Sequence, residues 1–204
     1  MSYANMFELN KCLKDSLQYC SDHPDRDHCE TFEPMLVRAL ENLTKATDSS
    51  DRKFTSWRME DRDGRLAWKH LARDLAQVQR ELKKVNAVGY LDQKVMYWDT
   101  GTLVLAVDEM IDYLRERTED LDFAEEKADK LERQKDSALN DTHDSDEALK
   151  DYIRFAQMRS DAMTETVNTI ASFRRVLRRE LGKKSDDYHS IRWPQAVASD
   201  EAVL

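Results

Sequence analysis

Apolar residues recur every three or four positions along most of the chain, the spacing of one face of an α-helix. The longest such stripe falls in two arms, separated by a polar stretch at residues 140–144. The first arm holds Val107, Met110, Leu114, Leu121, Ala124, Ala128, Leu131 and Ala138, and the second Ile153, Ala156, Met163, Val167, Ile170, Leu177 and Leu181. We therefore expect two long helices, about 102–140 and 145–182, that form an antiparallel hairpin. Asp144 and Glu147 have capping-box spacing, which favours a helix start at this point.

A third stripe predicts a helix over about 50–88. Its apolar positions are Phe54, Trp57, Trp68, Leu71, Leu75, Val78, Leu82 and Val85, in heptad register. Asp61 and Gly64 occupy the two missing places of this register. Asp-Gly is a turn signal, so we expect a bend there, and Gly89 is expected to end the helix.

Two shorter helices are expected before the three long ones. Met6, Leu9, Leu13 and Leu17 form the apolar face of the first. Residues 21–33 are rich in Asp and His and predict a loop, after which Pro34 is expected to open the second short helix. Residues 47–51 are polar and are expected to end that helix. After Gly182 the chain becomes polar again, and we expect a non-helical tail.

These patterns predict an all-α protein: an elongated antiparallel bundle of three long helices with two shorter N-terminal ones. We expect one bundle domain over residues 1–184 and a tail over 185–204. The composition agrees, because 36% of the residues are charged and the chain has only four glycines and three prolines.

The net charge argues against a chain that binds polyanions over its whole surface. A formal charge of −9 opposes the approach of nucleic acid or anionic lipid. The longest apolar run, residues 103–107, is far shorter than the roughly 18 residues of a membrane span. The first residues lack the features of a secretory signal, and three cysteines do not suggest a disulfide framework. We expect a cytoplasmic protein without a membrane span.

The N-terminal part contains a grouping of soft metal ligands. Cys20, His23, His28 and Cys29 could supply four ligands to zinc if a loop brought them together. Their spacing does not enforce tetrahedral geometry, and the alternative is that the cysteines pack as small apolar residues beside solvated histidines. These four residues are weak candidates, and no metal site or cofactor is expected.

The chain lacks the motifs of common catalytic sites. No pair of Glu-x-x-His motifs, glycine-rich phosphate loop, Gly-x-Ser-x-Gly elbow or His-Glu-x-x-His motif occurs. A calcium loop centred on Gly64 would need carboxylates where Met59 and His70 stand. We expect no enzyme and predict no catalytic residues.

A basic arc, residues 174–184, is the first candidate for partner binding. Arg174, Arg175, Arg178 and Arg179 share one side of the predicted helix end. The arc could bind an acidic partner, or it could complement the helix dipole and pair with Asp108, Glu109 and Asp112 at the start of the preceding arm. Trp193 in the tail is a second candidate, either as a plug on the bundle or as part of a motif that inserts into a partner.

The expected function is that of a non-catalytic scaffold, adaptor or assembly subunit that makes protein–protein contacts. Self-association is also expected, because charged residues interrupt the apolar stripes and would then share a surface with another chain. The interrupting residues are Asp61, Arg117, Lys135 and Arg174. The alternatives are a membrane- or nucleic-acid-binding module that uses the arc from Arg174 to Lys184, and a metal-binding protein that uses the Cys/His grouping.

Overall fold

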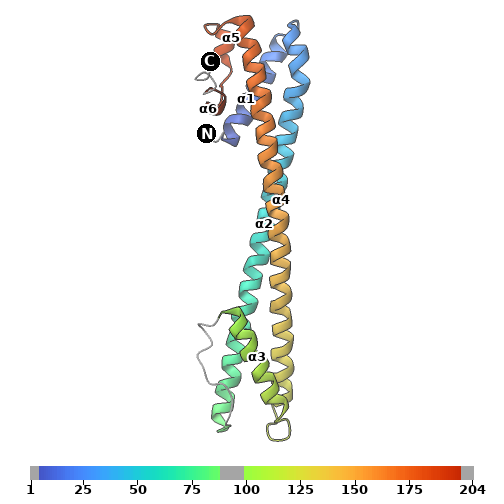
Figure 1. The fold of residues 1–204 in the computed structure, drawn as a ribbon, viewed down its shortest axis with the longest axis vertical. Helices are drawn as coiled ribbons and strands as arrows, with labels where there is room; N and C mark the ends of the chain where they lie inside the picture. Colours follow the sequence, from blue (N-terminus) through green and yellow to red (C-terminus); the bar gives the residue numbers. More distant parts are fainter. Residues whose placement is uncertain (1–4, 88–98, 199–204) are drawn as a thin grey trace. The chain divides into compact units, whose positions relative to one another are not determined.

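The regular structure of this chain is helical. The computed structural model describes residues 5–87 and 99–198, and within these ranges every regular element is an α-helix. The all-α class expected from the sequence is therefore confirmed. In chain order the helices are α1 (Met6–Asp22), α2 (Asp27–Lys84), α3 (Thr100–Arg115), α4 (Ala124–Leu181), α5 (Asp186–Ser190) and α6 (Gln195–Ala198), labelled in Figure 1.

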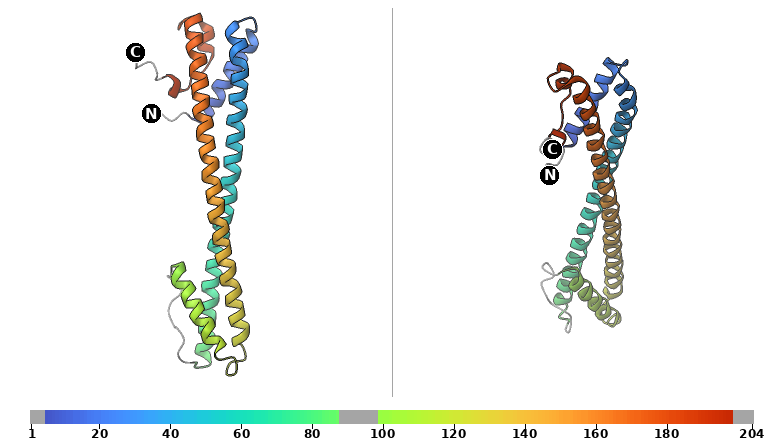
Figure 2. Two further views of the ribbon diagram at one scale, coloured as in Figure 1. Left: turned by 45° about the vertical axis from the view of Figure 1, so that its right-hand side comes forward. Right: turned by 45° about the horizontal axis from the view of Figure 1, so that its top comes forward.

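The contacts divide the chain into two units. Unit 1 comprises Met1–Lys53 and Asp151–Leu204, and unit 2 comprises Phe54–Lys150. Within each unit, α2 and α4 run side by side in opposite directions (Figures 1 and 2). Each unit adds its own further helices: α1, α5 and α6 in unit 1, and α3 in unit 2. The tail helices α5 and α6 thus pack within unit 1, and the domain boundaries expected from the sequence, 1–184 and 185–204, stay a prediction.

Each unit has its own apolar core. In unit 1 the residues of α1 pack against α2, α4 and the tail, and the largest fully buried side chain is Phe173. In unit 2 the apolar faces of α2, α3 and α4 meet. This second core includes Leu71, Leu75, Val78 and Leu82 of α2, Val107, Met110 and Leu114 of α3, and Ala124, Ala128 and Leu131 of α4. The apolar stripes predicted for these segments are therefore the buried faces.

The predicted break between the second short helix and the third long one is wrong. Helix α2 continues for 58 residues, from before Pro34 through residues 47–51 and past Gly64. The hydroxyl groups of Thr44 and Thr47 donate to the carbonyl oxygens of Leu40 and Leu43, at 2.8 and 2.7 Å. These polar side chains satisfy their hydrogen bonds on the helix itself, so they do not end it.

The hairpin turn is also displaced from its predicted position. Residues 140–144 lie inside α4, which is 58 residues long, and the turn lies at residues 116–123. Thr142 donates to the carbonyl oxygen of Ala138 at 2.9 Å, so its hydroxyl group is satisfied within the helix. The sequence could not reveal the turn at 116–123. The turn contains about as many residues as two turns of helix, so the apolar residues on either side of it keep the same register. The expected helices over 102–140 and 145–182 are thus α3 and a much longer α4.

The ends of two predicted segments differ in detail. Helix α2 ends at Lys84, where Asn86 adopts a left-handed φ of 52° and Ala87 donates to the carbonyl oxygen of Leu82 at 3.0 Å. This is the hydrogen-bond pattern of a Schellman cap. Gly89, the predicted end, lies outside the described residues. The tail expected to be non-helical contains two short helices, α5 and α6, because Tyr188, Ile191 and Val197 are buried against unit 1.

Gly64 marks a close approach of α2 and α4 in unit 2. It is buried, and a Cβ built on it would lie 3.5 Å from the carbonyl oxygen of Asp141, an ordinary van der Waals distance. A methyl group therefore fits, whereas a longer side chain would press on the backbone of α4.

We predict that Gly64→Ala stabilises unit 2 by roughly 0.5–1 kcal/mol, because alanine is the better helix former and the site has room for its methyl group. Gly64→Leu is expected to lower stability, because its side chain meets the α4 backbone. Urea unfolding followed by circular dichroism measures both. A destabilised alanine variant would show that the two backbones lie closer than the structure places them.

Candidate functional site

The Cys/His grouping lies in unit 1, where α1 meets α2 and the end of α4. Its rings form a stack around Tyr19, with centroid distances of 4.5 Å to His23 and 5.9 Å to His28. Phe173 of α4 closes the stack at 6.2 Å from the Tyr19 ring. The four residues predicted as weak metal candidates are thus part of an aromatic and thiol cluster around a buried tyrosine.

His28 uses both ring nitrogens inside this cluster. Nδ1 lies 2.5 Å from Oε2 of Glu180, and Nε2 lies 3.2 Å from the Tyr19 hydroxyl oxygen. A carboxylate only accepts, so in the neutral ring Nδ1 donates to Glu180 and Nε2 accepts from Tyr19. One buried histidine therefore joins residues of α1, α2 and α4.

The three cysteines are free thiols and all are buried. Burial raises the pKa of Cys12 to about 12, and it also raises the pKa of Cys20 and of Cys29, whose thiols hydrogen-bond to each other. Burial likewise raises the pKa of Tyr19 to about 12. Thiolate and phenolate, the reactive forms, are disfavoured. Within residues 5–87 and 99–198, no group of three or more His, Cys, Asp or Glu residues has the arrangement of a metal site.

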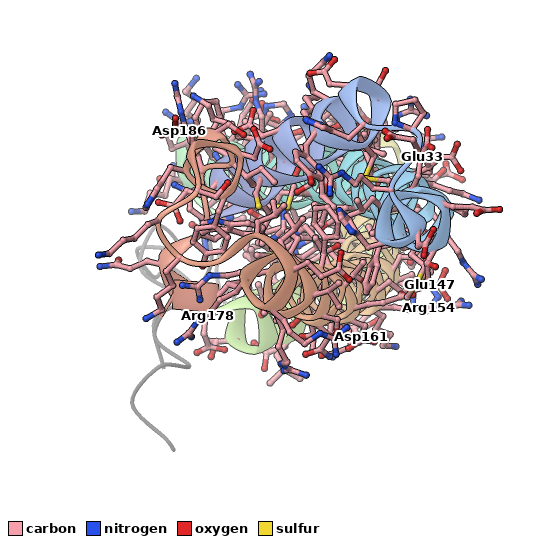
Figure 3. The ribbon with its side chains drawn as sticks, turned by 90° about the horizontal axis from the view of Figure 1, so that it is seen from above. Glu33, Glu147, Arg154, Asp161, Arg178 and Asp186 are labelled. Atoms are coloured by element: carbon pink, nitrogen blue, oxygen red, sulfur yellow. The ribbon has the colours of Figure 1, made fainter. Side chains whose placement is uncertain are left out.

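The basic arc is split by the fold. Arg174 turns toward the tail: its Nε donates to the Tyr188 hydroxyl at 2.8 Å and its Nη1 to the carbonyl oxygen of Val197 at 2.6 Å. Arg175, Arg178 and Arg179 are exposed. Figure 3 shows Arg178 on the outside of unit 1, like the labelled acidic residues of this unit. The outward basic surface of the arc therefore starts at Arg175.

Trp193 packs on its own chain. Its indole N–H donates to the carbonyl oxygen of Tyr188 at 3.1 Å, and its ring lies 6.5 Å from that of Phe173. Arg174 lies 5.9 Å from the Trp193 ring, within cation–π range. In this structure Trp193 therefore lies against the bundle, which is the position of a plug and not of a motif inserted into a partner.

The acidic residues near the end of α4 differ from those that the sequence suggested. Asp108 of α3 pairs with Lys135 at 2.6 Å in unit 2, whereas Arg174, Arg175, Arg178 and Arg179 belong to unit 1. The last turns of α4 lie beside the α1–α2 connection, where Asp187 lies 3.7 Å from His23. The predicted pairing assumed a hairpin turn at 140–144, and the turn lies elsewhere.

The charged residues that interrupt the apolar stripes have partners within their own units. Asp61 pairs with Arg65 at 3.0 Å, and Lys135 pairs with Asp108. Arg117 lies 4.0 Å from the centre of the Tyr113 ring, and Arg174 holds the tail. These interruptions therefore do not require another chain.

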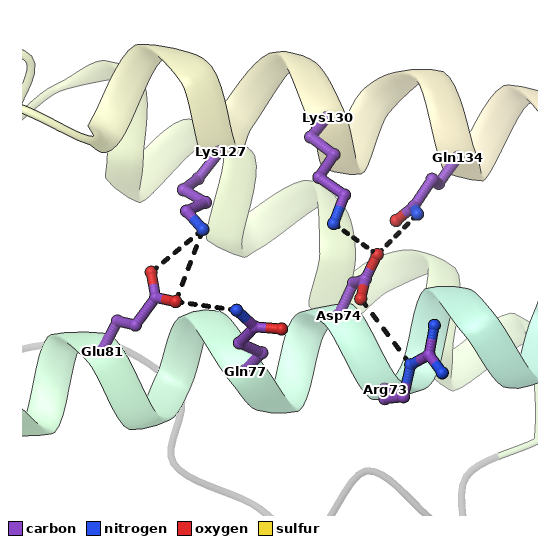
Figure 4. A network of polar contacts seen from close by, with 7 residues as sticks. All are labelled: Arg73, Asp74, Gln77, Glu81, Lys127, Lys130 and Gln134. Carbon is purple, nitrogen blue, oxygen red and sulfur yellow. Dashed lines mark hydrogen bonds and ion pairs between the residues drawn. The ribbon is translucent and has the colours of Figure 1, made fainter.

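A partly buried ionic network between α2 and α4 was not found from the sequence. Lys127, Lys130 and Gln134 project from α4 toward α2 (Figure 4). Asp74 accepts from Lys130 at 2.9 Å and from Gln134 at 2.5 Å. Glu81 pairs with Lys127 at 3.2 Å. Burial disfavours ionised Asp74, but the bonds from Lys130 and Gln134 outweigh it and hold the pKa of Asp74 below its usual value. The network fixes the register of the two helices in unit 2.

Two charged stripes on the outer faces of unit 2 were also missed. The basic stripe of α2 comprises Arg58, Arg62, Arg65, Lys69, Arg73 and Arg80, all exposed. The acidic stripe of α4 comprises Glu125, Asp129, Asp136 and Glu147, which are exposed, and the partly exposed Glu132. A search for charges at spacings of three and four would have found both, because this is the spacing by which apolar faces are recognised.

Two hollows lie in the surface of the described residues, one open and one small. An open hollow of about 560 Å³ in unit 1 is lined by Met35 of α2 and by polar side chains of α4, including Asp161 and Glu165. A space of about 10 Å³ lies beside Asp74 in unit 2. Neither hollow encloses a substrate-sized volume surrounded by converging polar groups.

The pKa of Asp74 gives a prediction for stability. Its pKa is lower in the folded than in the unfolded chain, so its contribution is complete above about pH 4, the unfolded value, and is lost as the pH falls through the folded value. We predict that Asp74→Asn costs about 1–3 kcal/mol at pH 7, because Lys130 loses its ionic partner. The difference from wild type should shrink in acid.

Urea unfolding at pH 7 and at pH 3 measures this difference. Asp63→Asn is the matched control, because Asp63 is exposed on the same helix. Equal effects of the two substitutions, or an Asp74 effect as large at pH 3 as at pH 7, would contradict the assigned role of the carboxylate.

Comparisons with other proteins provide no relative from which a function could be transferred. No family model matches the chain, and no curated protein or solved structure is significantly similar to it. None of the helices in residues 5–87 and 99–198 combines the length and hydrophobicity that crossing a membrane requires. The function must therefore be inferred from the geometry above.

Proposed function

We propose that this protein is a non-catalytic assembly subunit or adaptor of the cytosol, which binds protein partners through the sides of α2 and α4. One observation carries the proposal: each unit contains a stretch of these helices with apolar side chains but without buried residues. The free thiols agree with a reducing compartment.

In unit 1 this stretch lies on the first part of its α4 segment. No residue from 151 to 165 is buried, whereas Thr166, Ile170 and Phe173 further along are buried, the last two in the core that includes α1 and the tail. Ile153 and Met158 expose 58% and 48% of their surface in this stretch. Apolar side chains of this size remain in water only at a cost, so a covering surface would stabilise them.

Unit 2 has a corresponding stretch beside the core that α3 completes. No residue of α2 from 54 to 63 is buried, and none of α4 from 139 to 150. Met59, Phe54 and Leu139 expose 61%, 39% and 45% of their surface. Two helices alone cannot enclose an apolar face, and unit 2 gains its buried core only where α3 is present. These stretches are therefore the best candidates for surfaces that partner helices cover.

The polar clusters support the non-catalytic part of the proposal. The Tyr19–His28–Glu180 chain has three acid–base groups, but Tyr19 is only 3% exposed and a raised pKa keeps its phenol protonated. The Asp74 network is likewise occupied by interhelical bonds. Both clusters hold helices together through hydrogen bonds and ion pairs between helices.

We predict that a photo-crosslinking amino acid in place of Ile153 becomes covalently attached to a protein in cells that express the chain. Ile153 is the more exposed apolar residue of the unit 1 stretch, so the substitution leaves the core intact. Gel shift of the crosslinked chain measures attachment. The control places the same amino acid at Arg154, an exposed position one residue further round the helix. Efficient crosslinking at Arg154 but not at Ile153 would contradict the proposed surface.

A further inference from the structure

We infer that unit 2 binds a second copy of this chain, with the basic stripe of α2 in one copy lying antiparallel to the acidic stripe of α4 in the next. This inference rests on the proposed function and names the partner for one of its surfaces. It is carried by the placement of the charges, by a register in which they match, and by the apolar residues beside them.

The basic stripe faces away from the core of unit 2. Four members of this stripe stand two positions before a buried residue of α2: Arg62 before Gly64, Lys69 before Leu71, Arg73 before Leu75 and Arg80 before Leu82. Two residues turn a helix by about 200°, so the stripe lies nearly opposite the buried face. The chain as a whole carries a net charge of −9, which makes a one-sided row of six basic residues a specific feature.

Two members of the acidic stripe have the same relation to the buried face of α4. Asp129 and Asp136 precede by two positions the buried Leu131 and Ala138. Glu125 and Glu147 are exposed beside them, and Arg133 adds one basic side chain to this side of the helix. Within one copy, α2 and α4 meet through Asp74 and Glu81 on one side and Lys127 and Lys130 on the other. Apart from Arg73, which lies 3.9 Å from Asp74, neither stripe takes part in that contact, so both stripes are accessible to a second copy.

The spacings of the two stripes coincide in an antiparallel register. If Lys69 of one copy lies opposite Asp136 of the next, Arg73 lies opposite Glu132 and Arg80 opposite Glu125. Glu132 also pairs with Arg115 of α3 in its own copy, at 2.6 Å. The same register places Arg58 opposite Glu147, and it brings Leu66 opposite Leu139. The exposed fractions of Leu66 and Leu139 are 39% and 45%. One alignment thus pairs four basic with four acidic residues and joins two exposed leucines.

The contact between copies joins two different surfaces. Each copy offers a basic stripe on α2 and an acidic stripe on α4, and one contact uses one stripe of each copy. Such an interface is heterologous, so association continues beyond two copies unless a ring closes. Because exposed charges are screened over about 8 Å at physiological ionic strength, the association should weaken as salt is added.

Charge reversal tests the inference on the full-length chain. Lys69→Glu with Arg80→Glu reverses two positions of the basic stripe, and Glu125→Lys with Asp136→Lys reverses the two positions of the acidic stripe that lie opposite them, at the same spacing of eleven residues. Sedimentation velocity over a range of protein and salt concentrations measures association. We expect wild type to associate at low salt and each variant to dissociate about tenfold more readily or more. An equimolar mixture of the two variants should associate again, since reversed stripes of opposite sign then meet.

A matched control separates the stripes from net charge. Arg38→Glu with Lys45→Glu changes the net charge by the same amount as the basic-stripe variant, at exposed positions of α2 in unit 1. This variant should associate like wild type. Loss of association in the control, or failure of the mixed stripe variants to associate, would overturn the inference.

A disulfide test addresses the register. Leu66→Cys in one chain and Leu139→Cys in another should form a mixed disulfide when the two proteins are combined, because the three native cysteines are buried. Each protein alone should yield much less crosslinked product. A wild-type chain that stays monomeric at low salt, including one that binds duplex DNA or heparin as a monomer, would overturn the inference. If a chain that stays monomeric still crosslinks to a protein at position 153, this inference fails but the proposed function stands.

Discussion

The structure depends on the need of α2 and α4 for a third layer. Two helices that pack side by side bury only a narrow strip, and each of these helices carries a wider apolar face in places. Unit 1 meets the need with α1 and the tail, and unit 2 meets it with α3. Where neither is present, the same helices continue with their apolar side chains exposed. The proposed function follows from this incomplete burial, because no other element of the described chain covers those stretches.

Polar groups decide how the layers are aligned. Apolar faces slide easily past one another, whereas the pairs Asp74–Lys130 and Glu81–Lys127 fix one register in unit 2. In unit 1 the hydrogen bonds of His28 to Tyr19 and Glu180 tie three helices together, and Arg174 fastens the tail. On α2, the acidic residues Asp74 and Glu81 face α4 and the basic stripe faces outward. On α4, the basic residues Lys127 and Lys130 face α2 and the acidic stripe faces outward. This sorting makes the outer faces of unit 2 complementary between copies.

The sequence predicted the helical class and most buried positions, because burial in helices follows a regular spacing. The prediction is wrong where it ends helices at polar residues: Thr47 and Thr142 bond back to their own helix, and α2 and α4 continue through them. The hairpin turn at 116–123 was hidden because the apolar register resumes after it. The contact of His28 with Glu180 joins residues 152 positions apart, which no local pattern reveals. The prediction places Arg174 in an outward arc, although Arg174 also interrupts the apolar stripe of the second arm and so lies on its inward face.

Hydrogen exchange of the full-length chain tests the central claim most directly. In dilute protein at high salt, the account predicts fast exchange of the amides of residues 139–165, which are not buried, relative to the flanking parts of α4. At high protein concentration and low salt, the amides of residues 139–150 in unit 2 should become protected. Equal protection along all of α4 in the dilute chain, unchanged by concentration, would contradict the claim that a partner covers these parts of the helices.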